Sequence, residues 1–196
     1  WTVQVLADSR DSPAAVARPD SRALPVQVTA GASGPRSPRP SRRETPTDDL
    51  ASAIANGRVD GGPLSDMDTV SYYVIVASAG HDTTKDAISG GLHALIANPG
   101  ERERLRRDPG LMGTAVEEMI RWSTPVKEFM RTAAEDTEVR GVPIAKGDSV
   151  YLAYVSGNRD EEIFDEPFRF DVGRDPNKHL SFGYGVHFCL GAALAR

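Results

Sequence analysis

The sequence is short of cysteine, aromatic residues and long apolar runs. Its 196 residues include one cysteine, so no disulfide can form within the chain and the thiol is free for chemistry. The longest charge-free apolar stretch, residues 69–80, is shorter than the roughly 20 residues that a helix needs to cross a bilayer. The net charge of −5 gives no basic surplus for non-specific binding to nucleic acid. We therefore expect a soluble, cytoplasmic protein that binds neither nucleic acid nor membrane.

Residues 1–43 differ in composition from the rest of the chain. They contain no Phe, Ile, Met or Tyr, and seven Arg against three Asp give them a net charge of +4, whereas residues 44–196 carry −9. Such a segment, rich in Pro, Arg and Ser, cannot bury enough apolar surface to offset its chain entropy. We predict a disordered or non-native arm over residues 1–43 and a folded domain over residues 44–196. A tail that binds a partner or nucleic acid is the alternative.

The patterning after residue 47 indicates packed helices. Ser65 is a predicted helix N-cap, with Asp68 three residues later in a variant of the capping box. Pro99 and Pro109 follow Asn98 and Asp108, where helices are expected to stop or start. The predicted helices cover residues 48–56, 65–98, 101–107 and 111–122.

The residue pattern changes from helical to β-prone after the last of these helices. Short β-prone runs between Phe129 and Leu152 are separated by Arg140-Gly141 and Lys146-Gly147, which predicts hairpins. Residues 157–175 have little periodicity and many turn formers, so they are predicted to form a long ordered loop of the kind that often carries function. The fold class is therefore mainly α with a small β-sheet insert.

Cys189 follows a glycine-rich run and precedes a predicted helix. The N–H groups and partial positive charge at a helix start favour a thiolate, which is a metal ligand. Glycines let a backbone approach a flat ligand without Cβ clashes, and Phe182 and Phe188 can shield sulfur from water. Two alternatives remain open for the cysteine. It is either a small buried hydrophobic residue, or a nucleophile with His187 as its base.

The spacing Phe-x-x-Gly-x-His-x-Cys-x-Gly from Phe182 to Gly191 closely resembles the haem-binding signature of the cytochrome P450 family. The resemblance implies that Cys189 is the axial ligand of a haem b iron and that His187 reaches a haem propionate. It also implies a propionate-binding role for Arg131 in the first β-prone run. The haem-contacting positions of the signature are Phe182, Gly183, Gly185, His187, Cys189 and Gly191.

A second motif, Ala79-Gly80-His81-Asp82-Thr83-Thr84, lies in the middle of the long predicted helix. The Thr83 hydroxyl can donate to the carbonyl of Ala79, and such bonds bend helices. A solvated polar face is the plain interpretation. The six residues also resemble the oxygen-activation motif of the family, which implies that Asp82 and Thr83 relay protons during catalysis. No catalytic role is expected for His81 or Thr84.

Glu118 and Arg121 form a Glu-x-x-Arg pair on the predicted helix 111–122. Helical geometry puts Glu118 at the edge of the apolar face, whereas Glu117 points away from it. An exposed ion pair is the common outcome for such a pattern. The family has the same motif, completed by an Arg in the loop before the haem segment, and Arg169 fits that place. We therefore expect structural roles for Glu118, Arg121 and Arg169, and also for His179, while His93 is expected to be packed or at the surface.

The resemblance covers residues 47–196 and implies a cytochrome P450 fold truncated at both ends. It implies a monooxygenase that inserts one oxygen atom from O2 into a small apolar, terpenoid substrate. The electrons would come from NAD(P)H through a ferredoxin-type partner to a monomeric enzyme. The apolar lining is expected from Val74, Ile75, Ala77, Ala79 and residues 125–129. A haem-binding module without turnover and an inactive fragment are the alternatives.

Overall fold

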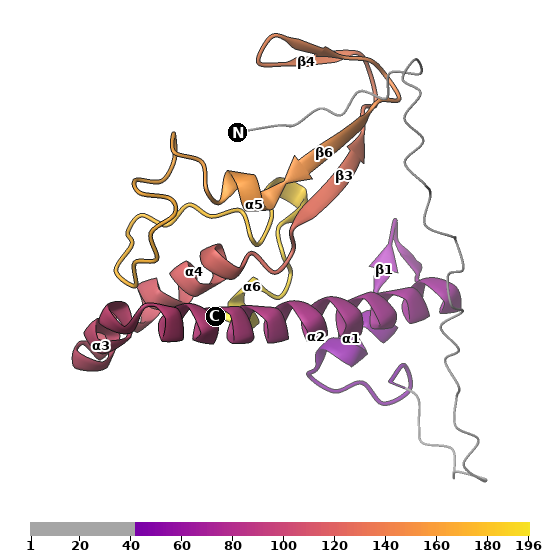
Figure 1. Cartoon of the computed structure of the whole chain (residues 1–196). Helices are drawn as coiled ribbons and strands as arrows, with labels where there is room; N and C mark the ends of the chain where they lie inside the picture. The colour runs from indigo at the N-terminus through magenta and orange to yellow at the C-terminus, as the bar shows by residue number, and fades with distance from the viewer. Residues whose placement is uncertain (1–41) are drawn as a thin grey trace, which may run out of the picture. The chain divides into compact units, whose positions relative to one another are not determined.

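The computed structural model describes residues 42–196 and divides them into two units, residues 42–77 and 78–196. The disordered arm predicted for residues 1–43 lies outside the described residues, apart from Arg42 and Arg43. The described part contains six α-helices and six short strands. Figure 1 shows their arrangement along the chain. The predicted fold class, mainly α with a small β insert, is confirmed.

The smaller unit begins with helix α1 (Leu50–Ala55), which is capped by Asp49. The Asp49 carboxylate accepts a hydrogen bond from the Ser52 amide at 2.7 Å. Arg43, which we assigned to the arm, is anchored here, because its guanidinium donates to the Ala55 carbonyl at 3.0 Å and pairs with Asp66 at 3.1 Å.

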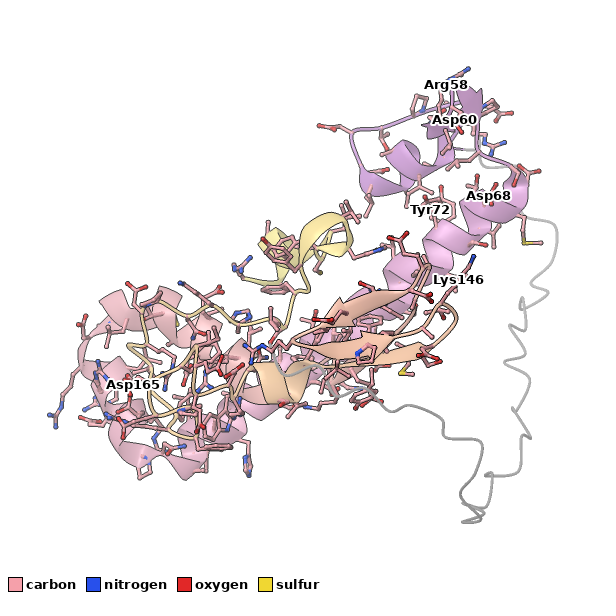
Figure 2. All side chains as sticks on the ribbon, turned by 90° about the horizontal axis from the view of Figure 1, so that it is seen from above. Arg58, Asp60, Asp68, Tyr72, Lys146 and Asp165 are labelled. Carbon is pink, nitrogen blue, oxygen red and sulfur yellow. The ribbon has the colours of Figure 1, made fainter. Side chains whose placement is uncertain are left out.

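A small hairpin follows α1, formed by β1 (Arg58–Val59) and β2 (Gly62–Pro63). The residues between the strands, Asp60 and Gly61, both have left-handed backbone angles, with φ of 49° and 78°. Arg58 and Asp60 lie on this hairpin (Figure 2). The residue pattern does not predict this hairpin, because two-residue strands are too short to show alternation.

Helix α2 (Asp66–Ala97) is the long helix predicted over residues 65–98. The Ser65 hydroxyl accepts from the Asp68 amide at 3.1 Å and donates to the Asp68 carboxylate at 2.6 Å, which confirms the predicted cap. The helix is unbroken through the polar motif at residues 79–84. None of the helices in residues 42–196, including α2, has the length and apolar character needed to cross a membrane.

The core of the larger unit lies where the second half of α2 meets α4. Helix α3 (Pro99–Arg107) and a 3-10 turn (Pro109–Leu111) lead into α4 (Met112–Ser123). Ala94, Ala115, Phe170 and Val172 are buried together, and the Trp122 ring meets the Phe170 ring edge to face at 5.5 Å. The two core residues from the loop after α5 tie that loop to the helices.

Two antiparallel ribbons form the β insert. Strand β3 (Glu128–Thr132) pairs with β6 (Ser149–Ala153), and β4 (Thr137–Val139) pairs with β5 (Val142–Ile144) around the predicted turn at Arg140-Gly141. The β4–β5 hairpin extends from the far end of the β3–β6 ribbon (Figure 1).

We expected the turn at Lys146-Gly147 to join a second hairpin of neighbouring strands. It does not, because the strand after the turn, β6, pairs with β3 and not with β5. The Gly147 amide donates to the Ala133 carbonyl at 2.9 Å just beyond the paired residues. Lys146 lies at this turn (Figure 2). A short helix, α5 (Tyr154–Gly157), follows β6 and leads into the predicted long loop.

Candidate functional site

The cysteine segment, residues 182–194, has a tightly folded backbone around the single cysteine. The Cys189 amide donates to the Phe182 carbonyl at 2.8 Å, and a 3-10 turn at Gly185–His187 lies between the two residues. Gly183 and Gly185 have left-handed φ of 72° and 67°. A Cβ at Gly183 would lie 3.2 Å from the His187 carbonyl oxygen, so this position requires glycine for its backbone angle and for space.

The Cys189 thiol is free and exposed. Helix α6 (Ala192–Ala195) begins after Gly191, and its first amide, that of Ala192, donates to the Cys189 carbonyl at 3.3 Å. A Cβ at Gly191 would lie 3.9 Å from the cysteine sulfur, so glycine leaves that side of the sulfur open. The thiol is therefore accessible, which excludes the interpretation of Cys189 as a small buried hydrophobic residue.

Apolar side chains in the same segment are also exposed. The exposed fractions are 78% for Tyr184, 98% for Val186, 84% for Leu190 and 93% for Leu194. Exposed apolar surface of this extent within a short segment is typical of a binding site. The open sulfur and these side chains fit a flat apolar group that carries a metal.

The Phe182 ring is held by two cationic or ionisable side chains. The His179 ring centroid lies 5.7 Å from that of Phe182, and the Arg196 guanidinium lies 4.5 Å from the Phe182 centroid. Both side chains bind Glu117, because His179 Nε2 lies 3.0 Å from Glu117 Oε2 and the Arg196 Nη2 donates to the same oxygen at 3.1 Å. Helix α4 thereby contacts the cysteine segment.

The pKa values of His179 and Glu117 are both lowered, for different reasons. Burial lowers the pKa of His179 below its ordinary value, against the opposing effect of the Glu117 carboxylate. The hydrogen bond from Arg196 lowers the pKa of Glu117. Glu117 is therefore ionised and His179 is neutral near pH 7, so the negative charge of this group faces Arg196.

Glu118 and Arg121 form a fully buried pair rather than the exposed one that such a pattern commonly gives. The exposed fraction of both side chains is 0%, and Arg121 donates two parallel hydrogen bonds of 2.7 Å to the Glu118 carboxylate. Arg121 also donates to the carbonyls of Asn158, at 2.8 Å, and Pro167, at 2.9 Å. The pair therefore anchors the long loop to α4.

We expected the Arg169 side chain to join this pair, and that prediction is wrong. The Arg169 guanidinium is half-exposed and pairs with Glu166 at 2.7 Å, while only its carbonyl accepts from Arg121, at 3.2 Å. Arg174 takes the expected place, because its Nε lies 3.2 Å from Glu118 Oε2. The loop has no regular periodicity, so the sequence does not show which of its arginines turns inward.

Asn158 is a further buried residue of this region that sequence analysis missed. Its side-chain Oδ1 accepts from the Leu180 backbone amide at 2.7 Å, and its side-chain Nδ2 donates to the hydroxyls of Thr124, at 3.0 Å, and Ser181, at 2.9 Å. These bonds fix the chain just before Phe182 to the end of α4. An Asn after a short helix resembles an ordinary cap, so the sequence carries no distinguishing signal.

The polar motif of α2 has the geometry that its sequence predicts. The Thr83 hydroxyl donates to the Ala79 carbonyl at 2.6 Å. The Asp82 carboxylate pairs with Lys85 at 2.7 Å, and this hydrogen bond lowers the pKa of Asp82. Asp82 is exposed and Thr83 is half-buried.

Two basic residues that the sequence assigned to a ligand are exposed. Arg131 lies on β3, where its guanidinium donates to the Met130 carbonyl at 2.9 Å and lies 5.3 Å from the centre of the Phe129 ring. His187 ends the 3-10 turn before Cys189. Neither side chain has an ion-pair partner within residues 42–196, so both are available to an anionic group.

Similarity to known proteins assigns the chain to a family. Residues 110–196, which include Glu118 and Cys189, match the cytochrome P450 family model. The chain is 48% identical over 155 residues to cytochrome P450-terp of Pseudomonas sp. It is 45% identical over 155 residues to a steroid C26-monooxygenase of Mycobacterium tuberculosis. The chain belongs to the cytochrome P450 family.

Solved cytochrome P450 structures agree with this assignment. The structure of a Mycobacterium marinum cytochrome P450 in complex with pseudoionone is similar at a TM-score of 0.75 and 51% identity, over 79% of this chain and 38% of that chain. CYP108D1 from Novosphingobium aromaticivorans is similar at a TM-score of 0.74 and 53% identity. The matched part covers 79% of this chain but only 36% of cytochrome P450-terp and 42% of the steroid C26-monooxygenase.

Proposed function

We propose that this chain is part of a haem-thiolate monooxygenase and that Cys189 supplies the axial sulfur ligand of a haem b iron. The observation that carries the proposal is the exposed thiol at the end of a loop with two left-handed glycines, in a chain of the cytochrome P450 family. Catalysis by a Cys189–His187 pair is less well supported, since no hydrogen bond joins the two side chains among the described residues.

The residues around the thiol fit a haem. The Cys189 sulfur would bind the iron, and the missing Cβ atoms at Gly183, Gly185 and Gly191 let the backbone lie close to a flat ring. The Phe182 ring, held by Arg196, would border the sulfur. Arg131, exposed and cationic, would neutralise one propionate, and the exposed His187 would hydrogen-bond the other.

The haem supplies the dioxygen and one-electron chemistry that side chains lack, and a thiolate ligand favours O–O cleavage. The chain's own contribution is proton handling at Asp82 and Thr83. Because the Thr83 hydroxyl donates its hydrogen to the Ala79 carbonyl, its oxygen remains an acceptor for a proton donor. The Asp82 carboxylate, whose pKa the hydrogen bond from Lys85 lowers, stays ionised and would accept hydrogen bonds from water molecules through which protons reach the site.

The substrate that we infer is small and apolar, in the terpenoid class. Val74 and Ile75 of α2 have exposed fractions of 60% and 61%, which supplies apolar surface on the helix that carries Asp82. One oxygen atom of O2 enters a C–H bond and the other leaves as water. The electrons for this reaction would come from NAD(P)H through a ferredoxin-type partner, and we propose a monomeric enzyme.

Titration of the purified chain with hemin tests the proposal. We expect the reduced carbon-monoxide complex of the wild-type chain to show the Soret shift of a thiolate ligand, and Cys189→Ser to abolish that shift. Glu103→Gln is the control, because it removes a carboxylate from exposed pairs with Arg106 and Arg107 on α3. A wild-type complex without the shift, or a Cys189→Ser complex that keeps it, contradicts the assignment.

The proton-handling role has its own test. Thr83→Ala is expected to preserve the haem spectrum and to lower substrate hydroxylation, whereas the neighbouring Thr84→Ala is expected to change neither. A chain that binds haem but shows no substrate-induced spin shift, with Thr83→Ala indistinguishable from wild type, would instead be a haem-binding module without turnover.

A further inference from the structure

Glu117 lies beside the buried Glu118 on α4 but faces a different part of the chain. Its carboxylate is the acceptor for two residues that enclose the cysteine segment, His179 before it and Arg196 after it. The exposed fraction of the Glu117 side chain is 25%, against 0% for Glu118. A half-buried carboxylate with two such partners is more than a solvated surface charge.

The two partners of Glu117 meet again on Phe182. The His179 ring lies 5.7 Å from the Phe182 ring, and the Arg196 guanidinium lies 4.5 Å from it. The carbonyl of Phe182 in turn accepts the Cys189 amide at 2.8 Å. A continuous set of contacts therefore runs from the Glu117 carboxylate, through His179 and Arg196 to the Phe182 ring, and from the Phe182 carbonyl to the backbone of the cysteine.

We propose that Glu117 is a positioning residue for the Cys189 sulfur, and that it acts by holding His179 and Arg196 against Phe182. This proposal rests on the proposed function only for the identity of the group that the sulfur binds, a haem iron. The clamp itself, defined as Glu117, His179, Arg196 and Phe182, belongs to the chain without haem. Its role is to keep the cysteine loop in the conformation in which the thiol can ligate a metal.

The first test is amide hydrogen exchange of the chain without haem. Loss of the charge-assisted bonds in Glu117→Ala is expected to speed exchange of the Cys189 amide at least about tenfold. The acceleration should be confined to residues 179–196, with the amides of α4 around Arg121 unchanged. Glu103→Gln, which removes a carboxylate elsewhere on the surface, should change neither region.

Two milder substitutions keep the test decisive if Glu117→Ala fails to fold. Glu117→Gln keeps the shape and an acceptor oxygen but loses the charge. Arg196→Lys keeps the charge but loses the planar guanidinium over Phe182. Each is expected to give a smaller acceleration than Glu117→Ala, and the double variant should show less than the sum of their effects on the free energy of opening. Additive effects would show that the two residues act separately and would overturn the clamp.

The second test uses hemin and the reduced carbon-monoxide spectrum. Weakening the clamp is expected to lower the fraction of complex with the thiolate-type Soret band. The loss should be smaller for Glu117→Gln than for Glu117→Ala. Faster exchange with an unchanged thiolate fraction would overturn the positioning role. If the wild-type chain shows no thiolate-type band, the proposed function fails, while unchanged Cys189 exchange in every variant would overturn the clamp regardless of haem.

Discussion

Replacing Glu118 by Gln removes the negative charge that faces the buried Arg121 guanidinium but keeps the volume of the side chain. Both side chains have an exposed fraction of 0%. Glu118 also accepts from the Asp171 amide and the Asn177 side chain, each at 3.0 Å. Removing one partner of such a pair leaves an uncompensated buried charge, which costs about 3–5 kcal/mol. We therefore expect Glu118→Gln to lose a large part of the free energy of unfolding.

Urea unfolding followed by circular dichroism measures this loss. A cost of this size corresponds to a lower urea midpoint by about 2 M. The matched control is Glu162→Gln, which breaks an ion pair of 2.9 Å with Arg140 whose side chains are 63% and 61% exposed. This control is expected to leave the midpoint unchanged, because exposed pairs contribute little. Equal midpoints for Glu118→Gln and Glu162→Gln would refute the assignment of the pair as the anchor of the long loop.

Three further outcomes follow from the same unit. Arg174→Gln should lower the urea midpoint clearly, whereas Arg169→Gln should not, since only Arg174 reaches the buried carboxylate; the reverse order would restore the role first expected of Arg169. Gly183→Ala should destabilise the cysteine loop by about 1–2 kcal/mol because of its left-handed φ, which amide exchange of that segment can measure. Burial lowers the folded-state pKa of His179 below 6.5, so its contribution to stability is complete above that pH and is lost as the pH falls through the folded pKa. Urea midpoints between pH 7 and pH 5 should therefore fall less for His179→Gln than for wild type, and parallel pH profiles would contradict this.

Local chemistry explains what could be predicted from the sequence. The cap at Ser65 and the Thr83 bond to Ala79 both join residues three or four positions apart, which helix geometry fixes. Gly183 and Gly185 have left-handed backbone angles, which glycine adopts most readily, so their positions in the sequence indicate the turns before Cys189. The resemblance of this segment to the cytochrome P450 signature led directly to the family.

Contacts that join distant positions could not be predicted in the same way. Glu118 and Arg174 are 56 residues apart, and Glu117 and Arg196 are 79 residues apart. Helical geometry predicted that Glu117 points away from the apolar face of α4, but not that a second segment covers that side. The pairing of β6 with β3 was missed for a related reason, because a turn signal fixes where the chain bends and not which strand it meets.

The consecutive carboxylates of α4 restrict how that helix can move. Neighbouring residues of an α-helix project about 100° apart, so Glu117 and Glu118 bind groups on two different faces of the same turn. A rotation of α4 about its axis that relaxed one set of bonds would stretch the other. Helix α4, the long loop that Glu118 binds and the cysteine segment that Glu117 binds should therefore shift together.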